Sequence, residues 1–221
     1  MSTGRTSIGD VLPALGLRIT AGPLELRGIT DEDLVTLGAL AVGGVHDPER
    51  MPFYHPWTEA SSLELPLKFA QYHWNLRASW SPQKWELNLG VWRDGVLLGV
   101  QGIATENFLV TRTGETGSWL GRAHHGRGTG TAMRQAMCAF LFDHLGFEEI
   151  TSGAFTDNPA SLAVSRKVGY RDNGVRRLKR REGELATNLG LVLTPEDFVR
   201  GEHPLEVHGL APFRRSIGLD S

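Results

Sequence analysis

The stretch GSWLGRAHHGRGTGT, residues 117–131, is the most informative part of the sequence for the fold. It opens with the apolar pair Trp119 and Leu120, which is typical of a strand end, and a short polar turn follows. Three glycines then alternate directly before an amphipathic helix, at Gly126, Gly128 and Gly130. Glycine lets the backbone turn tightly beside a ligand, and the free N–H groups of a helix start favour an anion. The stretch therefore predicts a pyrophosphate cradle between a strand and a helix.

The composition bounds the class of protein. The chain has 221 residues, 40% of them hydrophobic and 22% charged, and a formal net charge of -2. These values are typical of a soluble globular domain, and they give no basic excess for bulk nucleic-acid binding. The single cysteine, Cys138, allows no internal disulfide and suits a reducing cytoplasm. No apolar run approaches the roughly 20 residues that span a bilayer, and no signal pattern is seen at the N-terminus, so we expect a cytoplasmic protein that does not contact membranes.

The first half of the chain combines short strands and helices with an antiparallel meander. We expect residues 1–13 to be flexible and 43–60 to form an irregular loop. The predicted elements are strands over 15–20 and 24–29, helices over 30–41 and 63–80, and strands over 85–92, 96–105, 108–112 and 117–120. Asp94-Gly95 is a hairpin signal between two of these strands, and a loop is expected at 113–115.

The second half begins with the helix that follows the glycines. The predicted elements are a helix over 128–145, a strand over 149–155, a helix over 159–168, and strands over 170–180 and 185–193. Asn158 as N-cap with Pro159 behind it is a strong helix start. Residues 201–221 carry little pattern and are expected to form a tail or an arm. We therefore predict one α/β domain over 14–200.

Two motifs in this order and spacing resemble the GNAT acyltransferase superfamily. Trp119-Leu120 followed by GRGTG at 126–130 is similar to its acyl-CoA-binding motif, and NPAS at 158–161 followed by KVGY at 167–170 is similar to its second signature. LELRGITDED at 24–33 and LTPED at 193–197 resemble the subgroup that acetylates ribosomal-protein N-termini. Met51-Pro-Phe with Pro56-Trp57 is similar to an actinobacterial branch that includes succinyl-CoA-binding members. The resemblance covers about 15–200, and Ala123 departs from the Gln or Arg that the motif often carries.

The resemblance implies an α/β (α+β) fold with a mixed, mostly antiparallel central sheet and helices on both faces. The sheet would splay between its fourth and fifth core strands, which are the strand ending at Leu120 and the strand ending near Phe155. The pantetheine arm of the acyl-CoA would lie in this opening. The acyl carbonyl would accept a hydrogen bond from a backbone N–H near Leu120, which together with Ser161 makes up the implied catalytic pair.

The implied cofactor-binding residues lie at the two strand–helix junctions. They are Trp119, Leu120, Arg122, Gly126, Arg127, Gly128, Thr129, Gly130, Thr131, Asn158 and Ser161. The backbone N–H groups from Arg127 to Thr131 would hold the pyrophosphate, with Arg122 and Arg127 as further phosphate contacts.

Several of these residues also have a simpler structural explanation. Ser161 would protonate the leaving thiolate, or it would only bond the backbone at a helix start. Asn158 would bond the pantetheine, or it would only cap its helix. Arg166 and Lys167 would reach the adenosine phosphates, although solvated cations at a helix end are the simpler reading. The 51–57 loop would cover the core or form a wall of the acceptor pocket.

The sequence leaves the general base open and gives no metal site. The candidate bases are Glu86, Glu106, Glu115, His55 and His73. His124 and His125 are adjacent and do not converge on one ion, so no metal is expected. Cys138 is expected to be a small core residue, because it has no basic neighbour that would activate it. The basic residues at 176–181 are expected to form a solvated face.

The predicted function is transfer of an acyl group from acetyl-CoA or succinyl-CoA to a primary amine, by direct attack in a ternary complex. A protein N-terminus, a lysine and a small amine stay open as acceptors, and a homodimer stays open as the assembly. Succinyl-CoA would need a cation near the acyl end, and the sequence places none. A catalytically silent acyl-CoA sensor is the alternative. A P-loop is disfavoured because Thr131 and Ala132 follow the glycines where Lys and Ser or Thr would stand.

Overall fold

The computed structural model describes residues 7–220, which are organised around one nine-stranded sheet. The strands are β1 (Arg18–Ala21), β2 (Leu24–Gly28), β3 (Lys84–Arg93), β4 (Val96–Glu106), β5 (Thr113–Leu120), β6 (Glu149–Phe155), β7 (Arg171–Arg181), β8 (Glu184–Leu193) and β9 (Glu206–His208). Their spatial order is β7-β8-β6-β5-β4-β3-β2-β1-β9. All neighbours are antiparallel except β5 and β6. The mixed, mostly antiparallel sheet is therefore confirmed.

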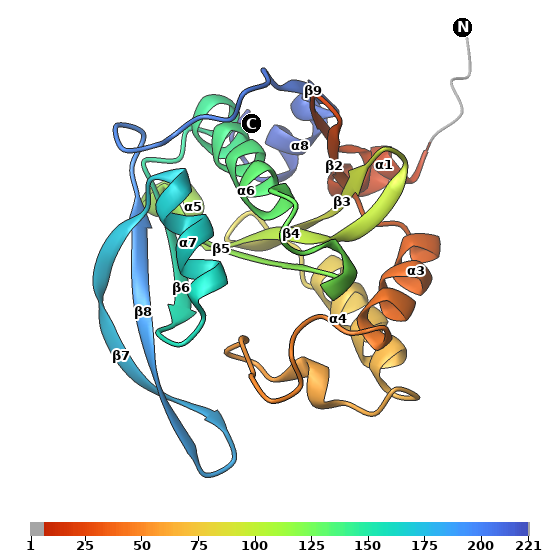
Figure 1. The fold of residues 1–221 in the computed structure, drawn as a ribbon. Coiled ribbons are helices and arrows are strands. Elements are labelled where there is room, and N and C mark those ends of the chain that lie inside the picture. Colours follow the sequence, from red (N-terminus) through yellow and green to blue (C-terminus); the bar gives the residue numbers. More distant parts are fainter. Residues whose placement is uncertain (1–6, 221) are drawn as a thin grey trace, which may run out of the picture.

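Helices cover both faces of the sheet, as predicted (Figure 1). α6 (Thr129–Phe140) and α7 (Pro159–Val168) pack on one face, and α3 (Asp31–Val42) and α4 (Leu65–Ala78) pack on the other. The shorter helices are α1 (Ile8–Val11), α2 (Pro13–Gly16), α5 (Phe108–Thr111) and α8 (Leu210–Ser216), with single turns η1 (Trp57–Glu59), η2 (Arg122–His124) and η3 (Leu141–Leu145). Within residues 7–220, no helix has the length and apolar character needed to cross a membrane.

The sheet divides the apolar core into a larger and a smaller part. The larger part lies under α6 and α7 and contains Met137, Cys138 and Phe140, all fully buried. The smaller part lies under α3 and α4 and is centred on Leu37 and Phe69. The amphipathic pattern of the helix after the glycines is thus confirmed, and Cys138 is the small core residue that the sequence predicts.

The meander matches the prediction except at its third strand. The β3–β4 hairpin turns at Asp94 and Gly95, which both have positive φ. The strand predicted over 108–112 is wrong: these residues form α5, in which Phe108 is buried against Phe147. β5 then runs without a break from Thr113, so the loop predicted at 113–115 is also wrong. A short apolar run has no periodicity that separates a strand from a helical turn.

Three other boundaries differ from the sequence expectations. The helix predicted over 128–145 changes at Leu141 into the π-helical turn η3, and Gly146 ends it with a φ of +71. Residues 8–16 hold α1 and α2, while residues 1–6 of the expected flexible segment lie outside the described part. The expected C-terminal tail or arm carries β9, which pairs with β1, and α8, which buries Phe213 in the larger core. Short apolar segments of this kind gain their structure from packing rather than from local pattern.

Candidate active site

The central feature of the site is an opening between β5 and β6. The two strands pair only over 113–115 and 149–151 and then diverge (Figure 1). Side chains replace the main-chain ladder where they part: Thr116 Oγ1 donates to the Thr151 carbonyl at 3.2 Å, and Ser152 Oγ donates to the Thr116 carbonyl at 3.2 Å. The strand ends at Leu120 and Phe155 therefore face a gap in the sheet, where the sequence predicts one.

The backbone of β5 offers free hydrogen-bonding groups to this opening. The Gly121 N–H donates to Leu98 at 2.8 Å, and the β4–β5 register places Trp119 opposite Val100. Hydrogen-bonded positions alternate along an antiparallel pair, so Ser118 and Leu120 turn their main-chain groups away from β4. The carbonyl of Leu120 is bonded by His125 Nε2 at 2.9 Å, and its N–H stays directed into the gap.

The glycine turn has the backbone shape of an anion cradle. Gly126 and Gly128 have φ of +74 and +77, and a Cβ on either would meet nothing within 4 Å. The N–H of Thr131 donates to the Gly128 carbonyl at 3.1 Å, so it is used inside the helix. Among the described residues, the N–H groups of 127–130 have no acceptor. The cradle therefore offers four N–H groups at the positive end of α6.

The cations around the cradle differ in where they lie. Arg93, at the end of β3, donates from Nη1 to the Arg127 carbonyl at 3.5 Å and to Thr129 Oγ1 at 3.4 Å. Sequence reasoning missed this residue, because only the β3–β4 hairpin brings it to the glycine turn. Arg122 bonds Gly44 through its N–H at 2.9 Å, and its side chain lies beside that glycine, at the loop after α3. Its predicted phosphate contact stays a prediction.

The second junction is fixed by a helix cap and an ion pair. Asn158 Oδ1 accepts from the Ser161 N–H at 3.1 Å, so Asn158 caps α7. The half-buried Ser161 hydroxyl has no hydrogen-bond partner within residues 7–220. Asp157 accepts two bonds from Arg180, at 2.9 and 2.7 Å, and these bonds hold the pKa of Asp157 below its ordinary value. The cap and the ion pair thus fix the turn that joins the end of β6 at Phe155 to the first turn of α7, which contains Ser161.

On the opposite face, each of the two diverging strands carries a glycine at the opening. Gly117 and Gly153 are the first residues past the point of divergence on the α3/α4 face, and both are exposed. A Cβ on Gly117 would meet nothing within 4 Å, and the Asn188 amide lies 3.0 Å from a Cβ position on Gly153. The Glu115 side chain precedes Gly117 on the same face of β5. Within residues 7–220 this carboxylate has no hydrogen-bond or ion-pair partner.

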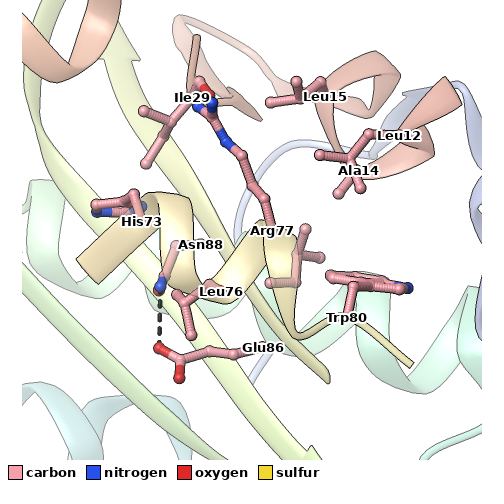
Figure 2. Close-up of a pocket in the computed structure, with 11 residues that line it drawn as sticks. Leu12, Ala14, Leu15, Ile29, His73, Leu76, Arg77, Trp80, Glu86 and Asn88 are labelled. Atoms are coloured by element: carbon pink, nitrogen blue, oxygen red, sulfur yellow. Dashed lines mark hydrogen bonds between the residues drawn. The ribbon is translucent and has the colours of Figure 1, made fainter. Parts of the chain in front are cut away.

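The other candidate bases are occupied or lie elsewhere. Tyr72 and Asn88 both donate to Glu86, the amide at 2.9 Å, in a pocket of about 40 Å³ that Figure 2 shows between α4 and β3. Burial lowers the pKa of His73, in the same pocket, to about 4. Glu106 pairs with Lys84 at 3.8 Å, and His55 packs on Tyr54. Glu115 is the candidate beside the opening.

The loop at 43–60 contributes an aromatic wall. Trp57 lies 5.4 Å from Trp119 between ring centroids, and Trp119 also meets Phe69 at 5.8 Å. Phe53 packs on Trp57 from the loop side. Both interpretations of this loop are therefore compatible with the structure, since its rings cover the smaller core and also border the α3/α4 side of the opening. The ring of Trp119 lies on the α3/α4 face, and its backbone belongs to β5, which forms one side of the opening.

The basic residues at 176–181 are partly paired and partly exposed. Arg181 pairs with Glu59 at 2.7 Å and ties the β7–β8 hairpin to the 43–60 loop, while Arg180 turns inward to Asp157. Arg176 and Arg177 are exposed on β7. In the described part of the chain no cluster of three or more His, Cys, Asp or Glu side chains could hold a metal ion.

Comparison with known proteins assigns the fold and the family. Residues 23–171 match the model of the acetyltransferase (GNAT) domain. This chain is 28% identical over 115 residues to YdaF of Bacillus subtilis (strain 168). The name of YdaF provisionally describes it as a ribosomal N-acetyltransferase. That match covers 50% of this chain and 62% of YdaF, so the chain spans less than two thirds of the curated relative.

Two solved structures have the same fold at low sequence identity. Mycobacterium smegmatis RimJ in complex with CoA-disulfide aligns with a TM-score of 0.65 at 18% identity, over 90% of this chain and 92% of RimJ. RimL, a ribosomal L7/L12 alpha-N-protein acetyltransferase in complex with coenzyme A, aligns with a TM-score of 0.63 at 19% identity, over 79% of this chain and 95% of RimL. Because the family model matches more than half of the chain, and the strand opening and glycine turn lie where the resemblance requires them, this chain belongs to the GNAT acetyltransferase family.

Proposed function

We propose that this chain transfers an acetyl or succinyl group from acyl-CoA to the α-amino group of a protein N-terminus. The observation that carries the proposal is the opening between β5 and β6. The free N–H of Leu120 on β5 borders this opening, and the glycine cradle follows the end of β5. RimL and YdaF, which are similar to this chain, support the acceptor class through their names. We place the reaction in the cytoplasm and assign it to residues 14–200, with β9 and α8 completing the edge of the sheet and the larger core.

In this proposal the donor enters from the α6/α7 face. The N–H groups of Gly128, Thr129 and Gly130 bind the pyrophosphate, and the Asn158–Ser161 turn borders the pantetheine arm. The acyl oxygen accepts from the Leu120 N–H, and one such donor aimed at a developing oxyanion is worth about 3 kcal/mol. Arg93 stabilises the cradle through its hydrogen bonds to the Arg127 carbonyl and to Thr129 Oγ1.

The acceptor amine enters from the α3/α4 face, between Gly117 and Gly153. Its nitrogen attacks the acyl carbon, a C–N bond forms, and the C–S bond to coenzyme A breaks. We assign Glu115 as the base that takes the amine proton, directly or through a water, because it is the unpartnered carboxylate beside the opening. Ser161 donates the proton that the departing thiolate takes up, and solvent returns a proton to Ser161 and removes the one held by Glu115.

The two glycines that border the opening, Gly117 and Gly153, favour an acceptor amine at the end of an extended chain. Neither Gly117 nor Gly153 presents a side chain, so the backbone of a peptide can come close to the gap. The Glu115 carboxylate attracts an ammonium group, and the rings of Trp57 and Trp119 leave an apolar surface for the next residues. A protein N-terminus has these properties together, which is why we prefer it to a compact amine.

The test is a coenzyme A release assay with acetyl-CoA and succinyl-CoA over a panel of acceptors. The panel contains peptides with free N-termini, the same peptides with a blocked N-terminus and a free lysine, and small polyamines. We expect release only with free N-termini, and mass spectrometry should place the acyl group there. Tight binding of acyl-CoA without release to any acceptor would contradict the proposal and favour the sensor alternative.

A further inference from the structure

Arg134 is a buried cation that lies across the opening between β5 and β6. It extends from α6, and only 4% of the residue is exposed. Its Nη2 donates to Ser118 Oγ of β5 at 3.0 Å, and its Nη1 donates to Ser152 Oγ of β6 at 3.4 Å. Its Nε donates to Gln101 Oε1 of β4 at 3.4 Å. The guanidinium therefore bridges the two strands just past the point where they part.

No acidic side chain in the described part of the chain neutralises this charge. Among residues 7–220, Arg134 takes part in no ion pair. A guanidinium has five N–H donors, and the three hydrogen bonds above leave two of them without an acceptor. Buried ions in folded proteins are normally paired with an opposite charge. The guanidinium also lies over the Tyr170 ring, 5.8 Å from its centroid, and within residues 7–220 its charge is met by this ring and by neutral hydrogen-bond acceptors alone.

The position of Arg134 relative to Leu120 indicates which anion fits. Its nearest partner, Ser118, is two residues deeper than Leu120 on the same edge of β5, and alternate residues of a strand are about 6.6–6.8 Å apart. An acetyl group extends one carbon–carbon bond, about 1.5 Å, beyond its carbonyl carbon. A succinyl group extends three such bonds and ends in a carboxylate. With its carbonyl at Leu120, only the longer group reaches toward Arg134.

We propose that Arg134 is a donor-specificity residue that binds the terminal carboxylate of a dicarboxylic acyl group of succinyl size. This proposal rests on the acyl-transfer function proposed above and on the acyl carbonyl lying at Leu120. The guanidinium presents parallel N–H donors that match a carboxylate. Ser118 and Ser152 hold it in place from both strands, so the cation is oriented before the donor binds.

A different role for the same charge would give a different signature. A cation at this place would also stabilise the thiolate that leaves with coenzyme A, whatever the acyl group. That role predicts equal effects of an Arg134 substitution on every donor. A purely structural bridge between β4, β5 and β6 predicts the same uniform loss, together with a lower melting temperature. Only recognition of the acyl carboxylate changes the ratio between donors.

The experiment compares succinyl-CoA, acetyl-CoA and butyryl-CoA on the full chain. Butyryl-CoA has the length of the succinyl donor without its carboxylate. We expect kcat/KM for succinyl-CoA to exceed that for butyryl-CoA by about tenfold or more, because a site built around a charged group rejects an analogue that leaves it unpaired. Direct titration of the same donors without an acceptor should give the same order of affinity.

Substitution of Arg134 separates the possible outcomes. In Arg134→Gln, succinyl-CoA should lose about tenfold or more in kcat/KM while acetyl-CoA changes less than about threefold. Arg134→Lys should keep part of the preference, and the control Arg200→Gln, at a surface pair with Asp143, should leave all rates unchanged. Equal losses with all donors, or no wild-type preference for succinyl-CoA over butyryl-CoA, would overturn the inference. If Arg134→Gln does not fold, the wild-type comparison still decides.

The two proposals fail in distinguishable ways. Activity with acetyl-CoA and a uniform effect of Arg134→Gln would remove the inference and leave the proposed function standing. Absence of acyl transfer with every donor would remove the proposed function. In that case a preference for succinyl-CoA in the direct titration, lost in Arg134→Gln, would still support an anion site at Arg134.

Discussion

The two faces of the sheet at the β5–β6 opening are built in different ways. On the α6/α7 face, backbone geometry dominates: positive-φ glycines, a helix start and the free N–H of Leu120. On the α3/α4 face, Gly117 and Gly153 leave a space. Side chains from distant segments border this space, with Glu115 on one side and Trp57 and Trp119 on the other. In the function proposed above, backbone groups hold the pyrophosphate of the donor and Arg134 contacts only its acyl end, whereas side chains alone select the acceptor.

The largest expected effect tests the acceptor face. Glu115→Gln removes the proposed proton acceptor without changing the size of the side chain, so kcat should fall about 100-fold or more. The KM for acyl-CoA should stay the same, because the carboxylate lies on the face away from the cradle. Steady-state kinetics with a fixed peptide acceptor measures both values.

The control for this variant is Glu106→Gln. Glu106 is exposed at the end of β4 and pairs with Lys84, so its loss should leave kcat within about twofold, as for most surface substitutions. A full kcat in Glu115→Gln would show that another group takes the proton. Glu86, held by Tyr72 and Asn88 in the pocket of Figure 2, would then be the next carboxylate to substitute.

The second effect tests the donor face. Gly128→Ala places a Cβ in the cradle at a φ of +77, which costs about 1–2 kcal/mol in backbone strain and obstructs the approach of the pyrophosphate. We expect the KM for acyl-CoA to rise about 50-fold, from the combined loss of N–H geometry and space. Titration with coenzyme A should show the same loss of affinity.

Gly183 provides a matched control for the strain. It lies in the β7–β8 turn with a φ of +72, and a Cβ there also meets nothing within 4 Å. Gly183→Ala should lower the melting temperature as much as Gly128→Ala and leave coenzyme A binding unchanged. Similar losses of affinity in both variants would mean that the cradle glycine acts only through stability.

The sequence predicts the donor face much better than the acceptor face. The glycine turn, the Asn158 cap and the strand end at Leu120 are local features, because a few neighbouring residues determine each of them. Each lies in the structure where the sequence predicts it. Arg93 reaches the cradle only through the β3–β4 hairpin. Arg134 lies in a helix stripe that the sequence describes only by its apolar positions. Nothing local marks such residues, since their partners are set by strand register and packing.

The same limit explains why five candidate bases could not be separated from sequence. Glu115 differs from Glu86 and Glu106 only in the strand position that the register gives it. The misassigned strand at 108–112 also hid its place, because β5 was expected to begin after Glu115 rather than at Thr113. Once β5 is continuous, Glu115 precedes Gly117 by one pleat and the two lie on one face.

The third effect tests whether the space beside Gly117 admits the acceptor. Gly117→Val fills the space on the α3/α4 face, and β-branched residues suit a strand, so the protein should fold. We expect the KM for a peptide acceptor to rise about 20-fold through steric exclusion, with an unchanged affinity for coenzyme A. An increase in the KM for acyl-CoA instead would place the blocked space on the donor side.

The smallest effect concerns stability and separates the two faces by their response to acid. His73 lies on the α3/α4 side, and burial lowers its pKa from 6.5 to about 4. Between these values the unfolded chain binds more protons than the folded one, so stability is complete above about pH 6.5 and falls as the pH drops. Cys138, on the α6/α7 side, has its pKa raised to about 11 by burial and stays neutral throughout this range.

Replacing His73 should therefore flatten the acid dependence. From pH 7 to pH 5.5 the wild type should lose about 1.2 kcal/mol of unfolding free energy at this site, because the unfolded imidazole binds a proton over this interval and the folded one does not. His73→Gln should be less stable at pH 7 but should lose that much less over the same interval, as measured by urea midpoints at both pH values. Parallel acid profiles for the two proteins would mean that His73 does not titrate on unfolding and that its burial does not distinguish this face of the sheet.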